Sequence, residues 1–183
     1  ASPLGAKEAI DAAAQAMPGG PVTQGKAWIE MIHRYLATAV GALITWMTVV
    51  AWRQARTPRL QPTLSPWWPT ATLVWVVVQG AFGALTVTMK LYPAIVTLHL
   101  MLGLGLLAML TVQAAMHQGK TVSLSRPTRW LAWIAAAAVV LQLAMGGWVS
   151  TNYAVLACQD FPTCQGGWWP RMNFTEAFVL DRP

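Results

Sequence analysis

Long apolar runs alternate with short polar connections along the chain. Four runs approach the length of a membrane-spanning helix, at residues 28–52, 67–89, 93–116 and 130–150. Roughly 20 residues of helix cross a hydrocarbon core about 30 Å thick. Because lipid offers no hydrogen-bond partners to backbone groups, each run is predicted to be helical. The pattern therefore predicts an all-α integral membrane protein, a bundle of four transmembrane helices.

Polar segments flank this block, which covers residues 27–151. Residues 1–26 are polar and rich in alanine, and residues 4–17 fit either a short surface helix or a plain loop. Residues 152–183 form the second polar segment and contain both cysteines. We expect the chain to be a fragment with sequence missing on both sides, because no initiator Met opens it and no stop-like element closes it.

Composition and charge agree with a membrane location. Hydrophobic residues make up 56% of the chain and charged residues only 10%, whereas a soluble domain carries about 25% charged residues. The net charge of +6 does not indicate nucleic-acid binding, because the basic residues cluster between the apolar runs. The first and third connections are predicted to be cytoplasmic by the positive-inside rule. They carry Arg53, Arg56, Arg59, Lys120, Arg126 and Arg129. Both chain ends and the Lys90 turn are then extracytoplasmic.

Small residues recur inside the apolar runs, at positions where neighbouring helices could touch. They include Gly41, Gly80, Gly103, Gly146 and Gly147. Such residues let helix backbones approach closely in a membrane. A glycine could equally make room for a flat cofactor, and the sequence does not separate the two.

Two histidines are predicted to lie at matching depth on different helices. With helix starts near Ala27 and Pro93, His33 and His99 each lie roughly 9 Å along their helices, entered from the outer side. Haem iron takes two axial ligands, and histidine is a common one, whereas zinc usually takes three or four protein ligands. No third histidine or cysteine shares this level. The pair predicts a membrane-embedded haem site, although two buried, hydrogen-bonded histidines would fit the spacing equally well.

Other ionisable groups surround the first of these histidines. Glu30 is three residues before His33, hence on the same helix face. A carboxylate beside a haem edge can take up or release protons, although Glu30 would also suit the positive end of a helix dipole. Arg34 and Lys90 are candidates to pair with haem propionates, or else to face lipid headgroups. Ionisable residues are costly inside a membrane, so their presence indicates a functional site.

The two cysteines, Cys158 and Cys164, are six residues apart around a Phe-Pro turn. The predicted topology puts them on the oxidising side of the membrane, where a disulfide is favoured. A redox-active dithiol remains the alternative.

Five segments carry motifs in order along nearly the whole chain. They are Glu-Met-Ile-His-Arg at 30–34, Gln-Gly-Ala-Phe-Gly-Ala-Leu-Thr-Val-Thr at 79–88, Thr-Leu-His-Leu at 97–100, Gly-Gly-Trp-Val-Ser at 146–150, and the cysteine loop that ends in Phe-Pro-Thr-Cys-Gln-Gly at 161–166. Together these segments resemble the haem A synthase family of cytochrome oxidase assembly proteins.

The resemblance implies an oxidoreductase that converts haem O to haem A by oxidising one ring methyl group to a formyl group. It implies eight helices in two related four-helix halves, with this chain similar to helices two to five. His33 and His99 match the histidine pair of the N-terminal half, viewed as the substrate-haem site. Glu30 matches the acidic residue thought to take part in catalysis, and Cys158 and Cys164 match a cysteine pair in an outer loop. A haem b would belong to the missing half.

The implied setting is a bacterial-type cytoplasmic membrane. The implied partners are haem O, membrane lipid, haem O synthase, and a quinone or another electron donor or acceptor. The chain alone is expected to be inactive, because helix one and helices six to eight are absent. A non-catalytic b-type cytochrome that carries electrons is the alternative, with the same histidines and no need for Glu30. A cofactor-free helix bundle that acts as an assembly scaffold is a third hypothesis.

Overall fold

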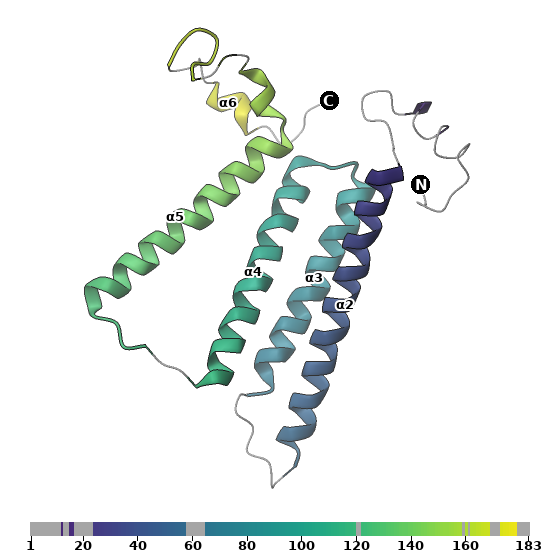
Figure 1. Cartoon of the computed structure of the whole chain (residues 1–183), viewed down its shortest axis with the longest axis vertical. Coiled ribbons are helices and arrows are strands. Elements are labelled where there is room, and N and C mark those ends of the chain that lie inside the picture. The colour runs from purple at the N-terminus through teal and green to yellow at the C-terminus, as the bar shows by residue number, and fades with distance from the viewer. Residues whose placement is uncertain are drawn as a thin grey trace. The chain divides into compact units, whose positions relative to one another are not determined.

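The computed structural model describes residues 12, 15–16, 24–57, 65–119, 122–158, 160, 162–168 and 173–178. Its helices are α2 (Gln24–Ala55), α3 (Trp67–Thr88), α4 (Pro93–Gln118), α5 (Arg126–Thr151), the 3₁₀ helix η1 (Ala154–Ala157) and the short α6 (Phe174–Ala177) (Figure 1). The four long helices are each long and apolar enough to cross a membrane. The predicted all-α fold with four membrane-spanning helices is therefore confirmed. The short helix considered for residues 4–17 lies outside the described residues, apart from 12, 15 and 16.

The chain divides into two units, Ala1–Pro62 and Thr63–Pro183, and each is described by itself. In the first unit, α2 begins at Gln24, three residues before the predicted start near Ala27. Polar residues can continue a helix beyond the hydrocarbon, so the helix is longer than its apolar run. His33 consequently lies roughly 14 Å from the start of α2, at 1.5 Å per residue.

A short turn joins α3 to α4 in the second unit. Lys90 and Leu91 adopt left-handed backbone conformations, with φ of 51° and 62°. The backbone N–H of Leu91 donates to the carbonyl oxygen of Thr86 at 2.8 Å and closes the turn. As predicted, Pro93 occupies the first turn of α4, where its missing N–H has no helical role. The turn returns the chain along α3, so the two helices are antiparallel neighbours (Figure 1).

Polar side chains and glycines alternate along the contact between α3 and α4. The indole Nε1 of Trp75 donates to the carbonyl oxygen of Leu102 at 2.8 Å. A Cβ atom at Gly105 would lie only 2.7 Å from Cζ2 of Trp75, so this glycine leaves room for the indole. Further along, the Gln113 amide donates to the Trp68 carbonyl oxygen at 3.1 Å and to the hydroxyl of Thr72.

Burial explains why these polar groups bond to one another. The side chain of Thr72 is 0% exposed and that of Gln113 is 3% exposed. Neither lipid nor water can replace their partners there, so each group must be satisfied within the protein. The contact between α3 and α4 therefore combines close backbone approach with interhelical hydrogen bonds.

Helix α5 begins at Arg126, four residues before its predicted apolar run. Ser125 caps it by accepting from the backbone N–H of Thr128 at 3.4 Å. The far end of α5 contacts α4, where a Cβ atom at Gly147 would lie 3.1 Å from Cδ2 of Leu100. Figure 1 shows that α5 diverges from α4, so that the N-terminal end of α5 lies farther from α4 than its C-terminal end does.

Candidate functional site

Glu30, His33 and Arg34 share one face of α2, because they are spaced three and four residues apart on a continuous helix. Arg34 donates from its guanidinium to Oε1 of Glu30 at 2.6 Å. All three side chains are exposed in the described structure. An isolated charge is costly in a membrane, and pairing two opposite charges lowers that cost. The pair also holds the Glu30 carboxylate on the face that carries His33.

The imidazole of His99 lies in the contact between α4 and α3. A Cβ atom built at Gly83 would lie 3.0 Å from Cε1 of His99, 3.6 Å from Nδ1 and 3.7 Å from Nε2. The ring therefore packs against bare backbone on α3, and Nδ1 is a buried atom. Gly83 forms a cradle that any side chain would partly fill.

A second contact holds the backbone at the same place. Gln79 donates from Nε2 to the carbonyl oxygen of His99 at 3.0 Å. The same nitrogen lies 3.1 Å from the position that a Cβ atom would take at Gly103. Each helix thus offers a polar side chain and, four residues later, a glycine that receives the polar side chain of its neighbour.

Sequence reasoning missed this reciprocal arrangement, although Gln79 and Gly83 lie in the motif at 79–88 and Gly103 is among the small residues that it named. The signal that could have found it is the shared spacing of four residues, Gln79 to Gly83 on one helix and His99 to Gly103 on the next. In antiparallel helices, equal spacing in opposite directions places each polar residue opposite the glycine of the other helix.

The predicted pairing of His33 with His99 joins two units that are described separately, so it stays a prediction. Propionate binding by Arg34 or Lys90 also stays a prediction. Arg34 is engaged with Glu30, and Lys90 is exposed on the turn between α3 and α4.

The residues present are compatible with a haem. Within the described part of the chain, no group of three or more His, Cys, Asp or Glu residues is placed to hold a metal ion. Haem iron already has four porphyrin nitrogens and needs only axial ligands from the protein. The cradle at Gly83 provides the second point of fit, because it gives the His99 ring a defined seat in the membrane.

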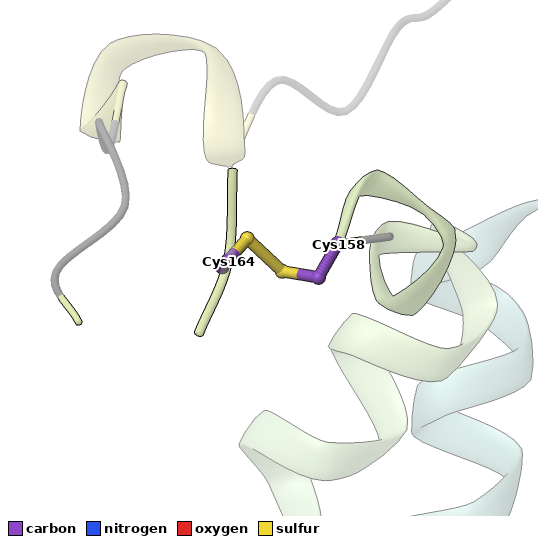
Figure 2. The surroundings of a disulfide bond; sticks show 2 residues. All are labelled: Cys158 and Cys164. Carbon is purple, nitrogen blue, oxygen red and sulfur yellow. A yellow bond between two sulfur atoms is a disulfide. The ribbon is translucent and has the colours of Figure 1, made fainter. Parts of the chain in front are cut away.

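A disulfide joins Cys158 to Cys164, with 4.8 Å between the Cα atoms. This confirms the predicted bridge. Figure 2 shows it linking the end of η1 to the loop that contains Cys164. The backbone of that loop also pairs Cys164 with Gly167, through N–H to O distances of 2.9 and 3.2 Å.

Trp148 anchors the segment that contains α6 to the end of α5. Its indole Nε1 donates to the carbonyl oxygen of Ala177 at 2.9 Å. Its ring stacks on Phe178 with a centroid distance of 6.2 Å. At the last residue of α5, the hydroxyl of Thr151 lies 3.2 Å from that of Thr97 and links α5 to α4. The N-terminal end of α4 and the C-terminal end of α5 are thereby joined two residues before His99.

Comparison with known proteins places these features in a family. The COX15-CtaA model, described as cytochrome oxidase assembly protein, matches residues 1–181. Over 165 residues the chain is 32% identical to a heme A synthase from Shewanella oneidensis, covering 88% of this chain and 48% of that protein. No solved structure matches the chain significantly.

Two more distant relatives carry the same name. A heme A synthase from Alkalihalophilus pseudofirmus is 27% identical over 148 residues, which cover 78% of this chain and 48% of the relative. One from Halalkalibacterium halodurans is 28% identical over 153 residues, which cover 79% of this chain and 49% of the relative. The chain therefore spans about half the length of the curated relatives it matches.

Proposed function

This chain belongs to the COX15-CtaA family of cytochrome oxidase assembly proteins, and from that premise we propose that it is part of an enzyme that converts haem O to haem A. One observation carries the proposal: the family match covers residues 1–181 and so takes in Glu30, His33 and His99. The relatives named above are heme A synthases, which does not favour the alternative of a non-catalytic electron carrier.

In the proposed site, His33 and His99 would hold the iron of the substrate haem O. A porphyrin iron supplies the one-electron chemistry of such a site. The protein contributes the two imidazoles at defined positions on rigid helices. The cradle at Gly83 supports this role, because it holds the His99 ring inside the contact between α3 and α4.

Glu30 is the proposed proton-transfer residue. Conversion of a methyl group to a formyl group takes its oxygen from one water molecule and releases four protons and four electrons (–CH3 + H2O → –CHO + 4 H+ + 4 e−). Glu30 takes up such protons, and its hydrogen bond from Arg34 at 2.6 Å keeps the carboxylate on the His33 face of α2. The electrons pass to an external acceptor, for which we propose a quinone. Arg34 and Lys90 are the proposed partners of the haem propionates.

The activity is proposed for the whole protein, with these four helices as helices two to five of an eight-helix fold. We place the protein in a bacterial cytoplasmic membrane, with the disulfide segment and the Lys90 turn on the outer side. A haem b would occupy the other half, and haem O synthase is the proposed supplier of substrate. Without helix one and helices six to eight, the chain is not expected to complete the reaction.

The decisive experiment is haem extraction from cells that express the full-length protein together with a supply of haem O. The wild type is expected to yield haem A. Glu30→Ala is expected to bind haem but convert it more slowly, on the order of 100-fold. His33→Ala and His99→Ala are expected to lose the absorption of the substrate haem.

The same experiment separates the alternatives. Wild-type cells that contain only unmodified haem O would overturn the enzymatic proposal. A Glu30→Ala protein with unchanged haem conversion would remove Glu30 from the mechanism, and bound haem without any conversion would indicate an electron carrier. A purified protein without Soret absorption, even after haem addition, would indicate a cofactor-free scaffold.

A further inference from the structure

Helix α3 holds His99 at two independent points, one on its ring and one on its backbone. The ring rests against Gly83, where an added Cβ atom would lie 3.0 Å from Cε1. That separation is shorter than ordinary van der Waals contact between carbon atoms, at about 3.5–4 Å. Any residue other than glycine at position 83 would therefore force the imidazole to turn or shift.

The backbone contact comes from one helical turn earlier on α3. The Gln79 amide donates to the carbonyl oxygen of His99 at 3.0 Å, and Gly103 leaves space for its nitrogen, which lies 3.1 Å from an added Cβ. This fixes the height of α4 relative to α3 at the residue that carries the imidazole. Height and ring rotation together define where the ring nitrogens lie.

The chemistry of Gln79 indicates that this contact has a function beyond packing. Its Oε1 is buried and has no hydrogen-bond partner within the described part of the chain. A buried carbonyl oxygen without a partner costs free energy in a membrane, where water cannot replace the partner. If the oxygen and nitrogen of the Gln79 amide were exchanged, its oxygen would face the carbonyl oxygen of His99. The hydrogen bond therefore requires Nε2 to face His99 and leaves Oε1 on the other side. A leucine would fill this position without leaving an unsatisfied oxygen.

We propose that Gln79 and Gly83 are positioning residues that set the orientation and height of the His99 imidazole as a haem ligand. The proposal rests on the proposed function, which makes His99 an axial ligand. Groups that orient a metal-ligating histidine tune the metal and typically contribute 10–100-fold to its binding. Here a glycine cradle and one amide bond to the backbone perform this task.

The test uses the full-length protein, purified with bound haem in detergent. The signal to follow is the part of the oxidised low-spin haem spectrum, in absorption and electron paramagnetic resonance, that disappears in His99→Ala. Gly83→Ala is expected to bind this haem on the order of 10-fold more weakly and to shift its resonance g values. Gly80→Ala is the matched control, because an added Cβ there meets nothing within 4 Å; its g values should equal those of the wild type.

Gln79→Leu is the second variant and keeps the proposal testable if Gly83→Ala does not fold. It fills a similar volume and removes the donor, so the g values should shift while the helical circular dichroism is retained. Gln142→Leu on α5, whose side chain is exposed, serves as its control. Unchanged spectra and haem affinity in both Gly83→Ala and Gln79→Leu, with loss of the signal in His99→Ala, would overturn the positioning role alone. Full retention of the spectrum in His99→Ala would overturn the proposed ligand itself.

Discussion

The imidazole of His99 packs directly on the backbone of Gly83, with Cε1 only 3.0 Å from the position of an added Cβ. Two helices that follow each other in the chain thus provide both the candidate ligand and its seat. Because α3 and α4 are joined by a short turn and are antiparallel, this relationship can form within one helical hairpin. Part of the proposed site is therefore organised locally, before any other helix contributes.

The contact between α4 and α5 can be tested with two adjacent glycines. Gly147→Ala would place a Cβ atom 3.1 Å from Cδ2 of Leu100, whereas Gly146→Ala meets nothing within 4 Å. We expect Gly147→Ala to lower the unfolding free energy of the full-length protein by about 1 kcal/mol, since the Leu100 side chain can partly move aside. Gly146→Ala should leave it unchanged or slightly raised. Equal effects of the two substitutions, measured by thermal unfolding in detergent, would contradict the observed packing.

The buried cluster of Gln113, Thr72 and Trp68 predicts a specific loss on substitution. Gln113→Leu removes the donor to both the Trp68 carbonyl oxygen and the Thr72 hydroxyl. Interhelical hydrogen bonds in membranes contribute about 0.6–2 kcal/mol, and we expect a loss of unfolding free energy in this range. Thr72→Val in the Gln113→Leu background should add less than it does alone, because the shared bond is already absent. Fully additive losses would show that the two side chains do not interact.

The disulfide is expected to stabilise the segment after α5 locally. Cys158 and Cys164 close a loop with a sequence separation of six, for which loop-closure entropy gives about 2 kcal/mol. Reduction should expose two thiols to a maleimide reagent and increase protease cleavage between η1 and α6, with the membrane helices intact. The variant with both cysteines replaced by serine is the control and should not respond to the reductant. Thiol labelling without prior reduction would contradict the bridge.

The pair of Glu30 and Arg34 predicts an effect on activity that exceeds its effect on stability. Both side chains are more than half exposed, at 58% and 53%, and exposed ion pairs contribute about 0–1 kcal/mol. Arg34→Ala should therefore barely change thermal unfolding, but it should slow haem O conversion because the carboxylate is no longer held on the His33 face. Arg34→Lys should retain part of the rate. Normal haem A content in cells that express Arg34→Ala would show that the reaction does not require Arg34 to position Glu30.

Two pairs of nearby glycines show most clearly where sequence reasoning ends. Gly146 and Gly147 are equivalent in the sequence, as are Gly80 and Gly83. Within the described part of the chain, an added Cβ meets a neighbouring helix at Gly83 and Gly147 but nothing within 4 Å at Gly80 and Gly146. Successive residues of a helix point in directions about 100° apart, so the rotation of the helix about its axis decides which glycine faces the neighbouring helix. The contact of Arg34 with Glu30, one turn away, is likewise a detail of the structure, and propionate binding by Arg34 stays a prediction.

The amino-acid sequence alone determined the four membrane helices and the ionisable residues within them, and it favoured the cysteine bridge that the structure contains. The reason is that each depends on local physics: lipid leaves the backbone no alternative to a helix, and two cysteines six residues apart can close a short loop. Only the tertiary structure decided that Gly83 receives the His99 ring, that Gln79 binds the His99 carbonyl oxygen and that Trp148 holds the segment after α5. These contacts depend on the rotation and height of packed helices, which many residues set together and no single stretch encodes.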